Sequence, residues 1–340
     1  MTFSLLSLPS LALIQVFKGF DPVQIVCLSL CSRKATTFIK HLWKAPKNWN
    51  ITIKVGCSLN MWVLAANDNE YVICAENANC YYRPGNPCKI QYPMNGKCCI
   101  DDIGNLDIFC EDRLLGFKKV TTHICEFFKA NITEIELHGI SGNWMVDWIK
   151  ERQIGKLKNM LVFFKKETTK AEYNAIMSCD IAESMALLGE IPKDVIASEH
   201  LPPTKTLIID NANWLTMDHL LAMQSEIFLC RYSELSNDYV NKFIRHWLDG
   251  GCPRLKYIAT GQKYLAHQEM YQGVLERLER VENEITYAWD NAGQIEYIWF
   301  GPSDQCYNIR RDDGVVATTF LSERIFEMVV WPDALNENVV

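Results

Sequence analysis

The first 31 residues carry more apolar helical surface than three short helices can bury among themselves, and this excess constrains the fold most. Between Leu8 and Phe17, only Pro9, Ser10 and Gln15 interrupt the hydrophobic side chains. A helix at the surface of a small domain usually has one apolar stripe, and a small domain buries only part of its surface. The excess must therefore contact either the rest of the chain or another protein.

Helix-start signals divide the N-terminal segment into three predicted helices. Ser7 is placed to cap the first helix, with Pro9 near its start, where a missing N–H has little cost. Asp21 and Pro22 repeat this pattern at the second helix. The third helix, over about Arg33 to Trp43, has a single apolar stripe, as a helix of a small domain should.

The next segment is rich in cysteine and in β-branched and aromatic runs, which predicts short strands. The predicted strands are 51–55, 61–65, 71–75, 89–92 and 106–110, and a helix follows at about 115–129. The cysteines between Cys57 and Cys125 include no Cys-x-x-Cys pair, and no histidine lies between Cys57 and Cys110. This spacing does not fit a zinc module, so we interpret the cysteines as small buried apolar residues.

The pattern then changes to alternating strands and helices. The predicted strands are 134–137, 160–164, 206–210, 226–229 and 255–258, the helices are 144–151, 171–178, 216–223 and 238–248, and an irregular unit lies near 182–191. Several strands recur about 20 to 30 residues apart, the period of leucine-rich-repeat units, although the strict repeat consensus is absent. A helix over about 268–283 and a β meander with a turn at Asp313-Gly314 complete the segment.

Together these patterns predict an α+β fold with three parts. They are an N-terminal three-helix module (1–45), a cysteine-rich β segment with a linking helix (46–130), and an irregular leucine-rich-repeat-like α/β domain that ends in a β meander (131–335).

Charge and hydropathy narrow the classes of partner. The net charge is −7 and the acidic residues are dispersed, so we expect no nucleic-acid partner. No stretch reaches the roughly 18 to 20 apolar residues of a membrane helix, so we expect no membrane partner. The apolar segment 3–17 has no preceding basic residue and no following cleavage site, which favours an intracellular location, cytoplasmic or nuclear.

Three motifs in the N-terminal helices resemble an F-box, in the version found in the large nematode F-box family. They are Leu8-Pro9-Ser10-Leu11, Asp21-Pro22-Val23-Gln24-Ile25 and Leu28-Ser29-Leu30-Cys31-Ser32-Arg33-Lys34. In that family the module binds the small adaptor subunit of cullin-based ubiquitin ligases.

Further motifs resemble the F-box-associated domain, type 2, of the same family. They are Trp214-Leu215-Thr216, the helix Asn241-Lys242-Phe243-Ile244-Arg245-His246-Trp247, the strand Pro253-Arg254-Leu255-Lys256-Tyr257, and residues Ile309 to Thr318. His219 departs from the pattern, which has an acidic residue at that position.

The resemblance implies a substrate receptor of a ubiquitin ligase that performs no bond chemistry and needs no cofactor or metal. It would hold an unidentified target protein close to a ubiquitin-charged enzyme. The residues expected to contact the ligase adaptor subunit are Leu8, Pro9, Leu11, Ile14, Pro22, Ile25 and Leu28.

Two other interpretations stay open at this point. In the first, the N-terminal helices pack on the chain's own α/β domain, and the protein is an interaction scaffold without a ubiquitin role. In the second, Cys230 or Cys252 acts with His246 as a Cys–His hydrolase, because such groups assemble in space rather than in sequence.

Overall fold

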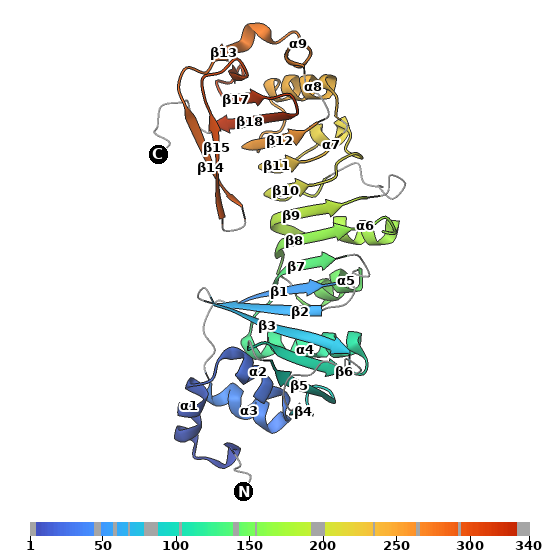
Figure 1. Cartoon of the computed structure of the whole chain (residues 1–340), viewed down its shortest axis with the longest axis vertical. Helices are drawn as coiled ribbons and strands as arrows, with labels where there is room; N and C mark the ends of the chain where they lie inside the picture. Colours follow the sequence, from blue (N-terminus) through green and yellow to red (C-terminus); the bar gives the residue numbers. More distant parts are fainter. Residues whose placement is uncertain are drawn as a thin grey trace. The chain divides into compact units, whose positions relative to one another are not determined.

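The structure is a computed structural model, and it divides into two compact units, Met1–His138 and Gly139–Val340 (Figure 1). The residues that it describes are 5–43, 49–56, 60–66, 69–77, 88–101, 104–138, 143–153, 155–191, 201–233, 235–262, 266–291 and 294–331. The predicted helical module and the predicted cysteine-rich segment both lie in the first unit. The predicted boundaries near residues 45, 130 and 335 stay predictions.

The first unit combines helices with a mixed sheet. Its helices are the 3₁₀ turn η1 (Leu5–Ser7), α1 (Ser10–Lys18), α2 (Pro22–Leu30), α3 (Arg33–Leu42) and α4 (Arg113–Phe128). Its strands are β1 (Asn50–Val55), β2 (Asn60–Ala66), β3 (Asn69–Asn77), β4 (Cys88–Ile90), β5 (Gly96–Ile100), β6 (Leu106–Cys110) and β7 (Ile132–His138). They follow the order β7-β1-β2-β3-β6-β5-β4, in which β1 is parallel to β7 and β3 is parallel to β6.

The three predicted N-terminal helices are present, and their caps differ in part from the prediction. Asp21 caps α2 as expected: its side chain accepts the Gln24 N–H at 2.7 Å, while the Gln24 side chain accepts the Asp21 N–H at 3.1 Å. The prediction for Ser7 was wrong, because Ser7 ends the 3₁₀ turn and Pro9 occupies the cap position of α1 without a side-chain hydrogen bond.

Strand β5 was not predicted from the sequence. It begins at Gly96, which follows Asn95 in a turn-like pair, and the apolar residues after it are Cys98, Cys99 and Ile100. In the structure Cys98 and Cys99 are both buried, and β5 pairs with both β4 and β6. The two buried cysteines agree with the interpretation of cysteine as a small apolar residue, whereas Cys57 and Cys80 lie outside the described residues.

The second unit is built on a row of parallel strands. Its helices are α5 (Asn143–Arg152), α6 (Lys170–Met177), α7 (Met217–Leu221), α8 (Asn237–Leu248), α9 (His267–Met270) and the 3₁₀ turn η2 (Leu275–Arg277). Its strands are β8 (Leu157–Phe164), β9 (Ile181–Gly189), β10 (Thr206–Ile209), β11 (Ile227–Cys230), β12 (Tyr257–Gly261), β13 (Leu278–Arg280), β14 (Ile285–Asn291), β15 (Gln294–Phe300), β16 (Cys306–Arg310), β17 (Val316–Leu321) and β18 (Ile325–Trp331).

Strands β8 to β12 are mutually parallel, and β18, β17, β16 and β13 continue from β12 in antiparallel order. This arrangement confirms a helical N-terminus followed by a mixed α/β region and a terminal meander. The irregular unit expected near 182–191 is an ordinary strand, β9. The leucine-rich-repeat character stays a prediction.

The helix predicted over 268–283 was wrong. Only α9 is helical there, and η2 and β13 follow it. Gly273 has a positive φ of 71°, and a Cβ built on it would lie 2.3 Å from Nη2 of Arg245. The left-handed backbone disfavours any other residue at this position, and a right-handed helix cannot continue through it.

The β14–β15 hairpin packs on the sheet as a separate layer. Figure 1 shows helices α6, α7 and α8 along one side of strands β8 to β12 and the hairpin along the other. Buried Trp289 and Phe300 of the hairpin share an apolar cluster with Ile227, Tyr257 and Trp331 of the sheet. Along the described parts of the chain, no helix combines the length and the apolar character that a bilayer crossing requires.

Candidate functional site

Helix α1 has one buried side and one side that the chain leaves open. Leu13 and Phe17 are 0% and 1% exposed, so they anchor the helix on the rest of the first unit. Leu11 is 79% exposed, and Ile14, one turn further along, is half-buried. Because residues three apart lie on the same side of a helix, these two side chains form an apolar ridge on its open side. Leu8 is half-buried and Pro9 is exposed at the start of this ridge.

Helix α2 behaves differently from α1. It contacts β3, β5 and β6 of its own chain, and Pro22 and Ile25 are buried, Ile25 completely. The apolar surface of this helix is therefore covered by downstream strands rather than left for a partner. Leu28 is half-buried. Of the seven residues predicted to contact the ligase adaptor, five keep exposed surface, and Pro22 and Ile25 do not.

Buried hydrogen bonds attach α2 to α3 and α4. The Ser29 hydroxyl lies 2.8 Å from Nε2 of His123, and the Thr36 hydroxyl donates to the Ser29 carbonyl at 2.7 Å. Burial, helped by the charge of Lys40, lowers the pKa of His123 to about 4. The imidazole is therefore neutral near neutral pH and forms part of the packing between these helices.

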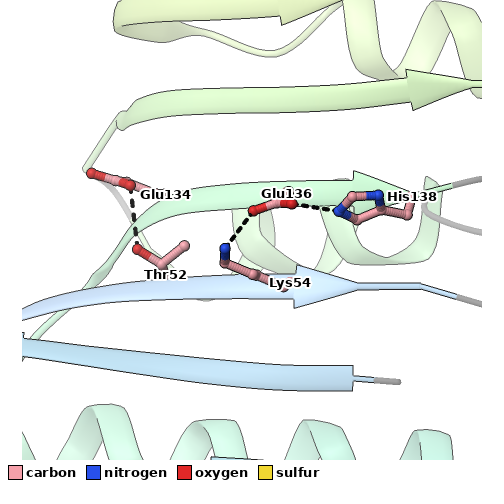
Figure 2. Close-up of polar contacts among 5 residues, drawn as sticks. All are labelled: Thr52, Lys54, Glu134, Glu136 and His138. Carbon is pink, nitrogen blue, oxygen red and sulfur yellow. Dashed lines mark hydrogen bonds and ion pairs between the residues drawn. The ribbon is translucent and has the colours of Figure 1, made fainter. Parts of the chain in front are cut away.

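A row of polar residues lines one side of the pair β1–β7, as Figure 2 shows. Lys54 donates to Glu136 at 2.8 Å, Glu136 also binds His138, and Thr52 donates to Glu134 at 3.3 Å. Partial burial acts to raise the pKa of Glu136, but the bonds from Lys54 and His138 outweigh it and leave this pKa lowered. A lowered pKa makes the carboxylate a weak proton acceptor, so the row is a charge-compensated sheet surface rather than an activated base.

In the second unit, the motif around Trp214 stabilises the start of helix α7. Nδ1 of His219 accepts the backbone N–H of Thr216 at 3.1 Å, and its ring packs edge-on against Trp214 with 5.4 Å between centroids. A carboxylate at this position would accept the same N–H in a capping box. The imidazole performs the same task, which explains how this position departs from the pattern without loss of the turn.

The motif on α8 is also structural. Asn241 donates to the carbonyls of Met270 and Gln272 at 2.7 and 3.0 Å, and it accepts from Arg245 at 2.9 Å. Trp247 is fully buried and lies beneath the Arg311 guanidinium, 5.4 Å from its ring centroid. Asn241 therefore fixes the segment around the end of α9, and Trp247 is a buried core residue of this unit.

The charged residues of the 309–318 element form ion pairs and hydrogen bonds within the chain. Arg311 pairs with Asp313 beside the turn, and Asp312 pairs with Arg277 at 3.2 Å. Arg310 donates to the carbonyl of Gly314 at 3.2 Å. The hairpin turn itself is present, with Gly314 at a φ of 93°.

The thiols proposed for a Cys–His hydrolase lack the required activation. Burial raises the pKa of Cys230 to about 12 and that of Cys252 to about 11. Cys252 instead donates to the carbonyl of Leu220 at 3.6 Å. A nucleophilic cysteine needs its pKa lowered, so both thiols behave as buried structural residues.

Comparison with protein-family models identifies two domains. Residues 5–49 match the F-box domain, and residues 201–259 match the F-box associated domain. No curated protein and no solved structure gives a significant match to the chain. The element at 309–318 lies beyond the second match and stays a resemblance.

Both families are adaptor and interaction domains, and F-box domains typically bind the adaptor subunit of cullin-based ubiquitin ligases. The first match includes α1, α2 and α3, and the second includes the Trp214 cap and α8. The chain therefore carries an F-box domain and an F-box-associated domain of type 2, as the motifs in both regions indicate.

Proposed function

We propose that this protein is a substrate receptor of a cullin-based ubiquitin ligase. Its F-box binds the ligase adaptor subunit, and the second unit binds a target protein. The receptor then acts without bond chemistry of its own, because holding a target near a ubiquitin-charged enzyme raises the effective concentration of the reacting groups. Such a receptor works inside the cell, in the cytoplasm or the nucleus.

The observation that carries the proposal is the combination of the two family matches with an open apolar ridge on α1. Leu11 is 79% exposed within the F-box match, although aliphatic side chains of this size are usually buried. We place the adaptor contact on the residues that keep exposed surface, namely Leu8, Pro9, Leu11, Ile14 and Leu28. Pro22 and Ile25 are left out of this contact, because both are buried within the chain.

The test is co-purification of the full chain with the ligase adaptor subunit. We expect Leu11→Asp to lose binding, since truncation of a buried anchor typically costs about 2 kcal/mol or more of binding free energy and a charge costs further. The matched control is Leu275→Asp, which changes another exposed leucine, 54% exposed, in the second unit. Both variants should unfold at the wild-type temperature, because neither side chain is buried in the free chain.

Deleting residues 1–45 would be a poor test of the same proposal. The deletion removes α2, uncovers its contacts on β3, β5 and β6, and leaves buried His123 without Ser29. Loss of binding would then be confused with loss of fold. A point substitution on the open side of α1 avoids this difficulty.

Two outcomes would contradict the proposal. The first is that the wild-type chain does not bind the adaptor subunit, which favours a scaffold without a ubiquitin role. The second is that Leu11→Asp and Leu275→Asp bind it equally well, which moves the contact away from α1.

A further inference from the structure

The β14–β15 hairpin presents aromatic side chains on both of its sides, and only one side is covered. Trp289 and Phe300 are 5% and 1% exposed and pack on the sheet. Tyr297 and Trp299, which alternate with the inward residues of β15, are 61% and 71% exposed. Successive side chains of a strand point to opposite sides, so these two rings stand together on the outer side.

The register of the hairpin leaves the two rings open. Tyr297 is paired with Ala288, and Trp299 is paired with Thr286. These cross-strand neighbours are small, so neither ring is covered by a bulky side chain from β14. Exposed Trp and Tyr are the side chains most often found as binding anchors in protein interfaces. We call Thr286, Ala288, Tyr297 and Trp299 the aromatic platform.

The platform lies in an acidic segment. Residues 281–309 contain five acidic side chains, Glu282, Glu284, Asp290, Glu296 and Asp304, and no Lys or Arg. Asp304 is paired with Arg280 at 3.1 Å, whereas Glu282 and Glu284 are exposed. Glu284 stands at the open end of the hairpin, since a Cβ built on Gly301 would lie 3.9 Å from its Cγ.

The negative charge of this segment determines which charge a partner of the open aromatic rings should carry. The face of an aromatic ring attracts ammonium and guanidinium groups, and nearby carboxylates strengthen this attraction. Nucleic acid and anionic membranes carry negative charge and are repelled by the same residues. Within the described residues, β14 pairs with β15 alone and β15 with β14 alone, so each strand offers an edge to an extended segment.

We propose that the aromatic platform binds an extended segment rich in lysine or arginine on a partner protein. Tyr297 and Trp299 contact the cationic side chains, while Glu282 and Glu284 supply the complementary charge. This inference rests on the proposed function, because that function identifies the partner protein as the target of the ligase. The binding step itself involves neither the F-box nor the adaptor subunit.

The test uses the full-length chain and two labelled synthetic peptides. One peptide alternates lysine with threonine, and the other alternates glutamate with threonine. We expect the lysine peptide to bind and the glutamate peptide not to bind. The double variant Tyr297→Ser/Trp299→Ser should weaken binding at least about tenfold. Glu282→Gln/Glu284→Gln should weaken it less and should reduce its dependence on salt concentration.

The control replaces an equally exposed aromatic residue elsewhere in the same unit. Tyr232 is 72% exposed and has a φ of 47°, a backbone conformation that asparagine tolerates, so Tyr232→Asn is the matched variant. It should bind the lysine peptide as the wild type does. Thermal unfolding of every variant should match the wild type, because the substituted side chains are exposed.

Three results would overturn the inference. They are equal binding of both peptides, lysine-peptide binding that survives Tyr297→Ser/Trp299→Ser, and binding of the platform to neutral phosphatidylcholine vesicles in place of the peptide. If the adaptor subunit still binds in these cases, the proposed function stands without this surface. If the lysine peptide binds but the adaptor subunit does not, the platform stands and the ligase role fails.

Discussion

The side chain of His123 makes the stability of the first unit depend on pH. It is 3% exposed, and burial together with Lys40 lowers its pKa to about 4. In the unfolded chain its pKa is about 6.5, so the unfolded chain binds a proton first as the pH falls. The contribution of His123 to the free energy of unfolding is therefore complete above about pH 6.5 and decreases as the pH falls toward 4.

Urea unfolding at pH 8 and pH 5 measures this effect. We expect the wild type to lose about 2 kcal/mol more stability between these two values than His123→Gln does. His41→Gln is the control, because His41 is an exposed histidine of the same compact unit, and it should follow the wild type. Equal pH dependence in the wild type and His123→Gln would contradict the buried neutral state of this imidazole.

At the scale of elements, local patterns predicted most helices and strands, and long-range contacts decided the rest. Asp21 and Pro22 mark the start of α2 in the sequence, and the structure places its start there. Whether α2 faces a partner or the chain's own strands depends on β3, β5 and β6, and the sequence did not indicate β5. The exposed side of α1 agrees with the predicted excess of apolar surface, while the burial of Ile25 does not.

The aromatic platform was also missed, for a physical reason. Large apolar side chains occur on both sides of the strand that carries the platform. The sequence therefore does not distinguish the buried side of the strand from the exposed side. Only the packing of Trp289 and Phe300 on the sheet shows that Tyr297 and Trp299 point outward.

The turn after α9 depends on α8 rather than on its own sequence. Asn241 holds the carbonyls of Met270 and Gln272, and Gly273 accommodates the side chain of Arg245. We expect Asn241→Leu to lower the free energy of unfolding by about 2 to 3 kcal/mol, because it leaves the buried carbonyl of Met270 without the donor from Asn241.

Chemical denaturation of the full chain checks this value. Lys242→Ala, the next residue on the same helix, is the control and should unfold as the wild type does, because its ion pair with Asp238 is at the surface. If Asn241→Leu is as stable as the control, the segment after α9 is held by other contacts.

At the scale of the whole molecule, the two proposed surfaces belong to different compact units. The apolar ridge of α1 lies in Met1–His138, and the aromatic platform lies in Gly139–Val340. Each unit has its own buried residues, so each surface is supported by different packing. A receptor that joins a ligase to a target needs this property, because occupation of one surface must leave the other free to bind.

This separation predicts that substitutions on the two surfaces act independently. Leu11→Asp should abolish adaptor binding and leave the affinity for the lysine peptide unchanged, while Trp299→Ser should weaken peptide binding and leave adaptor binding unchanged. In the double variant each affinity should equal that of the single variant that changes the same surface, within about 0.5 kcal/mol, as expected for sites that share no partner. Titration of the two single variants and the double variant with each ligand measures all six affinities. If the affinity for the peptide changes when the adaptor binds, the two surfaces are coupled. The proposed mechanism, which relies on proximity alone, would then be wrong, because proximity requires no such coupling.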